Sequence, residues 1–427
     1  MSSLCPSFSV SVGIPVFGLG FTQKNQLVVA GGGGAGRSGI KNKVSSYRID
    51  VRRKDLEEEA SLELSPDEDA PMCLDVHPTD HVVVAGVNQS KDHMERGDNQ
   101  NCRALSVSET NIDCQQTIKS MASTNADDYQ KVVRFSHDGK LVATGATNGE
   151  IHVFKYPEFE AHMDKVELEK SEILDVDISD DNAKLACVSR DALRIVRLRG
   201  KNAGEIVQTI HASSLEKKQK VEFRSFRHGR GYTKEMAFAV VNGRDRAFVC
   251  KFDVYSLEQQ KMVKVSNKPI TACSLSRDGA LLAIATSDLS IILLDALNMR
   301  VLTTLKNAHG FSITSIAISA DRRLLASGSA DNTCRIVSLP VQFPSHSVNP
   351  LYTLLLAMIV AGLVLWITTV YNQGTVENSI FLKGGLDDHA EADIPATTVD
   401  KYLKVVPSAT THFEPPSTPL FDSREEL

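Results

Sequence analysis

Aromatic residues are scarce in this sequence. Phe, Trp and Tyr make up 6% of the 427 residues, and the single tryptophan, Trp366, lies in an apolar run near the C-terminal end. No Trp-Asp dipeptide occurs.

The eight cysteines are scattered over residues 5–334, and no Cys-x-x-Cys pair occurs among them. Cysteines without paired spacing are typical of a reducing compartment. No Ser/His/Asp set or carboxylate pair at a local spacing points to a hydrolase.

Basic residues are not in excess either. The formal net charge is -6, and the stretch from Asn372 to the C-terminus holds ten acidic and four basic residues. The preceding part of the chain is therefore neutral. A neutral body argues against a nucleic-acid binder that works by bulk charge, because phosphate neutralisation supplies most of the affinity of such proteins.

Charge is absent altogether from residues 351–371, which read LYTLLLAMIVAGLVLWITTVY. A helix needs about 20 apolar residues to cross a bilayer. A buried helix of a soluble core would show a polar face, and this run has none. Aromatic residues lie toward its ends, as they do at membrane interfaces. The run predicts one transmembrane helix.

The orientation of this helix is inferred indirectly. The N-terminal stretch has no basic region, since the first charged residue is Lys24, and it is a poor secretory signal. We therefore expect residues 1–345 to be cytosolic, residues 351–371 to act as a signal anchor, and residues 372–427 to form a short, disordered, acidic lumenal tail. The ending Arg424-Glu425-Glu426-Leu427 is similar to KDEL-type signals, so a retrieval receptor is a candidate partner.

The body of the chain repeats with a period near 43 residues. Ser136, Ser179, Ser276 and Ser319 each open a polar turn followed by two strand-like runs, and they are spaced by 43, 97 and 43 residues. The wide interval contains one more unit, Met236–Val254. Runs of period two with turn residues between them are typical of strands.

Two looser units begin at Phe17 and Cys73, which brings the number to seven. Repeats of about 40–45 residues with four short strands are typical of WD-type propellers. The sequence therefore predicts an all-β, seven-bladed β-propeller over residues 1–345. We expect the strand Phe8–Val12 to close the ring by pairing into the last blade.

The least ordinary stretch is LVVAGGGGAGRSGIKNKV at residues 27–44. Gly31-x-Gly33-x-x-Gly36 matches a dinucleotide fingerprint, and Gly36-Arg37-Ser38 ends a near match to a phosphate-binding loop. Both motifs need a helix to follow, because its N-terminal amides hold the phosphate. A strand-like run follows here, which argues against nucleotide binding.

Three interpretations of this glycine-rich stretch remain open. It is an ordinary long turn, although four adjacent glycines are costly to order. Alternatively, backbone carbonyls of the first four glycines hold a hard cation. Or the loop binds a partner, with Ile40 as an apolar tip and Asn42 as a hydrogen-bonding group. The candidate cation ligands are Gly31, Gly32, Gly33 and Gly34.

The glycine stretch, the seven-unit repeat and the late single anchor together resemble one family. These are the WD-repeat exchange factors of the endoplasmic-reticulum membrane that act on the Sar-type GTPase of COPII coats, called prolactin regulatory element-binding proteins in animals. The resemblance implies a guanine nucleotide exchange factor, not an enzyme with covalent chemistry, that loads GTP on this GTPase and starts ER-to-Golgi vesicle transport. Other COPII components are then possible partners.

The resemblance also implies roles for individual residues. Gly31 to Gly34 would surround a potassium ion, while Gly39, Ile40 and Asn42 would act on the GTPase. Fungal members carry proline where this chain has Lys41. Lys41 and Arg37 are further candidate partner contacts, and Pro71 is a candidate because it lies at the top of the strand that enters blade two, next to the expected GTPase surface.

Two competing classes of function stay open. A membrane-anchored WD-repeat scaffold without exchange activity would need no special loop. A DNA-binding transcriptional regulator would need a basic face and access to the nucleus, and the neutral body and the anchor both argue against it.

Overall fold

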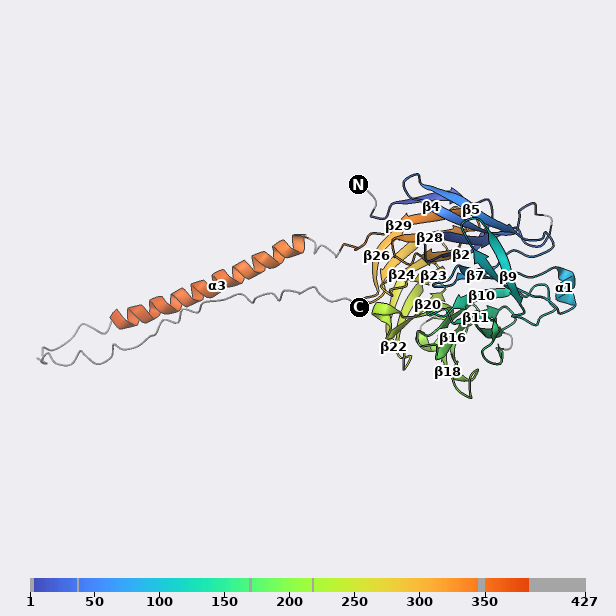
Figure 1. Ribbon diagram of the computed structural model, residues 1–427. Helices are drawn as coiled ribbons and strands as arrows, with labels where there is room; N and C mark the ends of the chain where they lie inside the picture. Colours follow the sequence, from blue (N-terminus) through green and yellow to red (C-terminus); the bar gives the residue numbers. More distant parts are fainter. Residues whose placement is uncertain (1–3, 37, 169–170, 217–218, 345–349, 384–427) are drawn as a thin grey trace, which may run out of the picture. The chain divides into compact units, whose positions relative to one another are not determined.

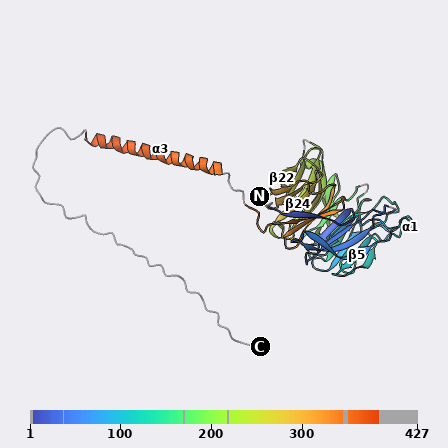
Figure 2. The same ribbon diagram turned by 90° about the horizontal axis from the view of Figure 1, so that it is seen from above.

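The computed structural model describes residues 4–36, 38–168, 171–216, 219–344 and 350–383, in two separate units, 1–343 and 344–427. The first unit contains seven antiparallel sheets arranged as blades (Figures 1 and 2). Blades one to three contain β2 (Val16–Phe21), β3 (Leu27–Gly31), β4 (Lys43–Asp50), β5 (Asp55–Glu63); β6 (Cys73–Val76), β7 (Val82–Gly86), β8 (Cys102–Val107), β9 (Ile112–Ile118); β10 (Gln130–Phe135), β11 (Leu141–Ala146), β12 (Glu150–Lys155), β13 (Glu160–Ala161), β14 (Val166–Glu167).

Blades four to seven continue in the same order, from the innermost strand outward. They contain β15 (Asp175–Ile178), β16 (Lys184–Val188), β17 (Ala192–Arg197), β18 (Ile206–His211); β19 (Val221–His228), β20 (Met236–Gly243), β21 (Ala247–Asp253), β22 (Gln259–Ser266); β23 (Ile270–Leu275), β24 (Leu281–Thr286), β25 (Ile291–Asp295), β26 (Arg300–Leu305); β27 (Ile313–Ile318), β28 (Leu324–Ser329), β29 (Thr333–Ser338). Short helices α1 (Lys91–Glu95), α2 (Ala212–Leu215) and η1 (Gly231–Thr233) lie in connections. The predicted all-β, seven-bladed propeller is confirmed.

The core lies between neighbouring blades. The second strand of each blade is sandwiched on both faces, so β3 and β24 are buried along their whole length and read as continuous apolar runs. Outer strands such as β18 and β26 are mostly exposed or half-buried. One representative cluster joins blades four and five through Leu193, Phe223 and Phe252.

The repeated serines are turn-forming residues. Ser136 Oγ donates to Asp138 Oδ1 (2.7 Å) and accepts from the backbone nitrogen of Leu141 (3.0 Å). Ser319 makes the same two contacts, to Asp321 (2.6 Å) and from Leu324 (2.9 Å). Ser179 and Ser276 make the same contacts, so the same hydroxyl closes the turn between the first and second strands in blades three, four, six and seven, which explains the 43-residue spacing.

The N-terminal strand completes the last blade. β1 (Ser7–Ser11) pairs antiparallel with β29, with Phe8 opposite Ile336. The predicted closure is confirmed. Because the ring closes in this way, the outer edge of blade seven is supplied by the start of the chain.

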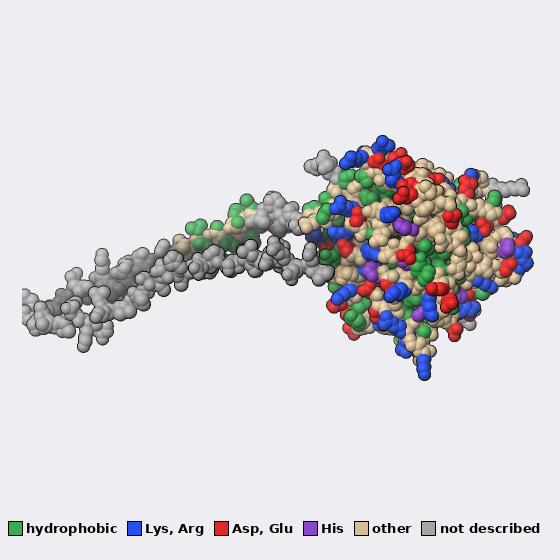
Figure 3. All heavy atoms as spheres, in the orientation of Figure 1, with side chains coloured by type: hydrophobic (Ala, Val, Ile, Leu, Met, Phe, Trp, Pro, Cys, Tyr) green, Lys and Arg blue, Asp and Glu red, His purple; other side chains and the backbone are tan. Residues whose placement is uncertain are grey.

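Strand direction gives the propeller two distinct faces. The connections between blades and the loops joining second to third strands lie on one face, here called the loop face. The remaining turns lie on the opposite face, here called the turn face. On the side seen in Figure 3, basic and acidic side chains of the propeller are interspersed, as its neutral charge predicts.

The second unit contains α3 (Pro350–Lys383), a helix of 34 residues. Its window Leu354–Tyr371 has a mean hydropathy of 2.3, so by length and composition it is a candidate membrane span. The helix continues past residue 371, where the predicted span ended. The predicted tail from residue 384 onward, including the retrieval-like ending, lies outside the described residues.

Candidate functional site

The glycine loop, residues 32–42, joins β3 to β4 on the loop face of blade one. Its base is buried at Gly32 and Asn42, whereas the stretch from Ser38 to Lys41 is exposed. Ile40, near the tip, is 37% exposed. The strand β4 follows the loop directly, so the helix that both phosphate motifs require is absent from this part of the chain. The loop is therefore a surface projection on a β-hairpin and not a phosphate cradle.

The Asn42 side chain closes the base of the loop from inside. Asn42 is 5% exposed, its Oδ1 accepts from the backbone nitrogen of Gly34 (3.0 Å), and its Nδ2 donates to the carbonyl of Gly34 (3.1 Å). The same Nδ2 donates to the carbonyl of Glu68 (2.8 Å). One amide thus fixes the far side of the loop and the chain that enters blade two. In this arrangement Asn42 positions the loop from inside, and the tip around Ile40 stays exposed.

The backbone of the glycine stretch lies too close to its surroundings for larger residues. A Cβ on Gly32 would meet Asn42 Oδ1 at 2.2 Å, and one on Gly33 would meet Ser38 Oγ at 2.1 Å. Gly32 also has a φ of +154° and donates to the Pro15 carbonyl (3.1 Å). The glycines are needed because the loop folds back over the Asn42 amide.

A second layer of polar side chains supports this base. Asp69 Oδ1 accepts from the backbone nitrogens of Ala35 (3.2 Å) and Ala70 (2.8 Å). The Glu68 carboxylate pairs with Arg103 on β8, and both side chains are largely buried. Sequence reasoning missed Glu68, Asp69 and Arg103, because their contacts join distant stretches and follow no motif spacing.

The charged candidate Lys41 behaves as a surface residue, whereas the side chain of Lys43, at the start of β4, is largely buried. Lys41 Nζ lies 2.6 Å from Glu63 Oε1, with both side chains more than half exposed. Lys43 Nζ lies 2.9 Å from Glu58 Oε2. Burial raises the pKa of Glu58, but hydrogen bonds from Lys43 and Tyr47 outweigh it, so the pKa of this carboxyl lies below its usual value.

Two candidates do not join the surface of the loop in the described structure. Pro71 is buried in the connection between blades one and two, so its side chain is not on the surface. Arg37 lies outside the described residues. Gly39, Ile40 and Lys41 remain as the exposed candidates.

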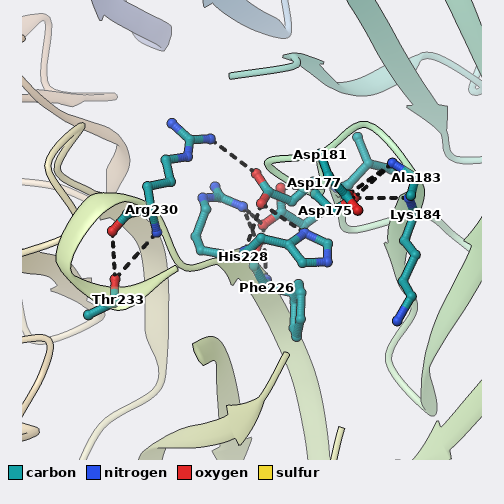
Figure 4. A network of polar contacts seen from close by, with 12 residues as sticks. Asp175, Asp177, Asp181, Ala183, Lys184, Phe226, His228, Arg230 and Thr233 are labelled. Carbon is teal, nitrogen blue, oxygen red and sulfur yellow. Dashed lines mark hydrogen bonds and ion pairs between the residues drawn. The ribbon is translucent and has the colours of Figure 1, made fainter. Parts of the chain in front are cut away.

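The central channel holds the other concentration of charge, in a cavity of about 620 Å³ lined by the inner strands. Arg227 pairs with Asp175, and Arg230 Nη2 lies 3.6 Å from Asp177 Oδ1 (Figure 4). Burial raises the pKa of Asp177, but a hydrogen bond from His228 and the charges of Arg230 and Arg227 outweigh it and lower the pKa to about 2. Paired charges of this kind fix the inner strands to one another.

The described side chains do not form a metal site of the usual His, Cys, Asp and Glu type. Within the described residues, no group of three His, Cys, Asp or Glu side chains is placed to hold a metal ion. No disulfide joins the described cysteines, and among them Cys114 alone is exposed. A cation at the glycine loop would depend on backbone and amide oxygens instead.

The sequence is similar to a repeat family and to several known proteins. Residues 299–338 match the model of the WD domain, G-beta repeat. The "Guanine nucleotide-exchange factor SEC12" of Candida glabrata is 24% identical over 78% of this chain and 72% of its own length. The mouse protein of the same name is 23% identical over 80% of this chain and 92% of its own. The chain resembles the SEC12 exchange factors.

Further likenesses agree. "SEC12-like protein 2" of Arabidopsis thaliana is 24% identical over 71% of this chain and 74% of its own length. Among solved structures, Chaetomium thermophilum Raptor superposes with a TM-score of 0.61 at 13% identity, covering 79% of this chain and 29% of that one. A chain of the mitotic checkpoint complex gives 0.58 at 12% identity, covering 78% and 93%. These two structures show the propeller fold alone, and the SEC12 resemblance that the glycine stretch indicated is confirmed by the sequence relatives.

Proposed function

We propose that this protein is a guanine nucleotide exchange factor for a small GTPase, and that the GTPase is of the Sar type that starts COPII coats at the endoplasmic reticulum. The observation that carries the proposal is the glycine loop: an exposed tip on a base fixed by the buried Asn42 amide. The names of the SEC12 relatives support exchange activity and a small GTPase partner. The glycine stretch supports the Sar type.

An exchange factor of this kind forms no covalent bond. It accelerates GDP release because it binds the nucleotide-free GTPase more tightly than the loaded one. The loop would act on the switch segments that phosphate and magnesium normally order. Ile40 would enter the partner as an apolar wedge, and exposed backbone groups near Gly39 would take over hydrogen bonds that the nucleotide had made. Because Asn42 orders the loop beforehand, less binding energy is spent on ordering it in the complex.

We also propose a potassium ion at the base of the loop. The Gly34 carbonyl, Asn42 Oδ1 and the Asp69 carboxylate lie there, and each accepts a hydrogen bond from a neighbouring N–H group that an ion would have to replace or share. Hard cations prefer such ligands. Gly31 belongs to β3 and pairs with Lys43, so carbonyls from Gly32 onward are better candidates. When bound, the ion would add rigidity to the loop and supply no step of the exchange reaction.

The helix α3 would anchor the activator in the membrane on which its product acts. We propose the propeller, residues 1–345, on the cytosolic side, residues 351–371 as the span and residues 372–427 in the lumen. The Asn-Gln-Ser glycosylation pattern at residue 88 does not report on this orientation, because Asn88 is 4% exposed and hydrogen-bonded. A glycosylation site engineered into the tail does report on the orientation. We expect this site to be glycosylated, and a tail that is unmodified and accessible to added protease would contradict the proposed orientation.

The deciding experiment measures release of a fluorescent GDP analogue from a Sar-type GTPase by the full chain in lipid nanodiscs. We expect at least a tenfold acceleration over empty nanodiscs. A chain that leaves the release rate unchanged would favour a passive scaffold. Repeating the assay in potassium and in sodium tests the ion separately, since equal rates in both buffers remove the ion and keep the exchange function.

A further inference from the structure

Two loops on the loop face differ in length from all their counterparts. The loops joining second to third strands comprise residues 32–42 in blade one and 87–101 in blade two, but only three or four residues in each of the other five blades. The short turns show that three residues suffice to close a blade. Long ordered loops on a compact fold are typically functional. The insertion segment, residues 87–101, therefore requires an explanation of its own.

The insertion segment is bonded to the support of the glycine loop. Asp69, which holds Ala35 of the glycine loop, donates its backbone nitrogen to the Asn88 carbonyl (3.0 Å). Arg103, at the start of β8, pairs with Glu68, whose carbonyl accepts from Asn42. The Asp69–Asn88 hydrogen bond thus joins the insertion segment to the support of the glycine loop, and the Arg103–Glu68 pair joins the strand that follows the segment to the same support.

Buried amides hold the insertion segment in one conformation. Asn99 Nδ2 donates to Asn88 Oδ1 (3.1 Å), and Asn99 Oδ1 accepts from the backbone nitrogen of Gln89 (2.9 Å). Asn101 donates to Ser120 Oγ (2.9 Å). Asn99 and Asn101 are 1% and 0% exposed. Burying three amides is costly unless each is bonded, so this segment is ordered before any partner arrives.

The outer surface of the insertion segment is polar and carries charges of both signs. In the helix α1, Met94 is buried and anchors the turn, while Lys91, Glu95 and Arg96, which directly follows the helix, are exposed. Both views place α1 at the edge of the propeller (Figures 1 and 2). Such a surface is typical of the polar rim of a protein interface, where charges set orientation and the rate of encounter.

We propose that the insertion segment is a second docking element for the GTPase, which contacts the partner's polar surface beside the switch region that the glycine loop engages. This inference rests on the proposed function. The glycine loop and the insertion segment belong to neighbouring blades and are joined through residues 64–72. A folded GTPase that binds the tip of the glycine loop would therefore also extend over the insertion segment. The insertion segment fixes the orientation of the bound GTPase, and the glycine loop opens its nucleotide site.

The test compares two double variants of equal charge change on the same face. K91E/R96E alters the insertion segment, and R244E/R246E alters the exposed turn of blade five. GDP release is measured with the full chain in nanodiscs against GTPase concentration. We expect K91E/R96E to raise the half-saturating GTPase concentration at least fivefold with an unchanged maximal rate, and R244E/R246E to stay within twofold of the wild type.

A third variant separates docking from folding. Asn99→Ala loosens the insertion segment without changing its exposed surface, and it should raise the half-saturating concentration by a smaller factor than K91E/R96E. Thermal unfolding of K91E/R96E should match the wild type. Equal half-saturating concentrations in the two double variants overturn the docking role and leave the function of the glycine loop intact. A wild-type chain without exchange activity overturns both.

Discussion

The side-chain amide of Asn42 is hydrogen-bonded to both backbone polar groups of Gly34, at 3.0 Å from the nitrogen and 3.1 Å from the carbonyl oxygen. The two residues are eight positions apart, so this pair ties the ends of the glycine loop together. The same arrangement occurs once more on the loop face, where Asn242 bonds the nitrogen (2.8 Å) and carbonyl (2.9 Å) of Ile270. The second pair provides a control with the same chemistry.

We expect Asn42→Ala to slow GDP release at least tenfold. Removing the amide leaves the groups at Gly34 and Glu68 without their partner, which costs about 1–3 kcal/mol and frees the loop. Hydrogen exchange at the Gly34 amide should accelerate in parallel. Asn242→Ala should lower the unfolding free energy by a similar amount while exchange activity stays within twofold; a matching loss of activity would show that stability, not the loop, is measured.

Ile40 is expected to contribute through contact alone. Ile40→Ala removes an apolar side chain that is only 37% exposed, so the thermal unfolding temperature should fall slightly, whereas GDP release should slow about tenfold because the lost burial in the complex amounts to roughly 1–2 kcal/mol. Leu297→Ala is the control, because Leu297 is 45% exposed in a turn on the opposite face. Equal release rates in both variants would exclude Ile40 from the contact.

Gly32 should not tolerate a side chain. Gly32→Ala places a methyl group 2.2 Å from Asn42 Oδ1, so the amide must move and exchange activity should fall at least tenfold. Gly200→Ala introduces backbone strain at a φ of +82° with nothing within 4 Å of the new Cβ, and it lies in a turn between β17 and β18. It should cost about 1 kcal/mol of stability and no activity. An active Gly32→Ala variant would contradict the packing of the loop base.

Stability should depend on acid pH through Asp177. Its pKa is lowered to about 2, and the side chain is 1% exposed. A lowered pKa stabilises the fold above the unfolded value near 3.8, and this contribution of roughly 2 kcal/mol disappears as the pH falls toward 2. Asp177→Asn should therefore lower the unfolding free energy by about 3 kcal/mol at pH 7, because Arg227 and Arg230 lose a buried partner.

Urea unfolding at pH 7, 5 and 3 checks this expectation. The difference between the wild type and Asp177→Asn should be the same at pH 7 and 5 and smaller at pH 3. The exposed Asp245→Asn should stay within about 0.5 kcal/mol of the wild type at each pH. A difference that grows on acidification would contradict the assignment.

Much of the fold was predictable because its cause is local. Ser136 and Ser319 close the same turn with their own side chains, so their spacing reports the repeat directly. The second strands are buried on both faces, so their apolar runs are long enough to recognise. The split outer strand of blade three, where β13 and β14 both pair with β12, gave no such signal, because exposed outer strands carry little apolar pattern.

The candidate site was only partly predictable. The glycines and Ile40 stand out in the sequence by composition and position. The burial of Asn42 does not, because it depends on Glu68, which comes from the connection to the next blade. Arg103 pairs with Glu68 across 35 residues, and no pattern of one strand encodes that distance. Support of this kind becomes visible only when the blades are placed side by side.

The pairing of β1 with β29 has a consequence for biosynthesis. Phe8 can pair with Ile336 only after Ile336 has been synthesised. At about 5–20 residues per second, the ribosome needs roughly 15 to 65 s to make the intervening chain. During that interval the first strand has no neighbour on its own sheet, and exposed strand edges are prone to wrong association. Nascent chains of this protein should therefore depend on chaperones until the ring is sealed.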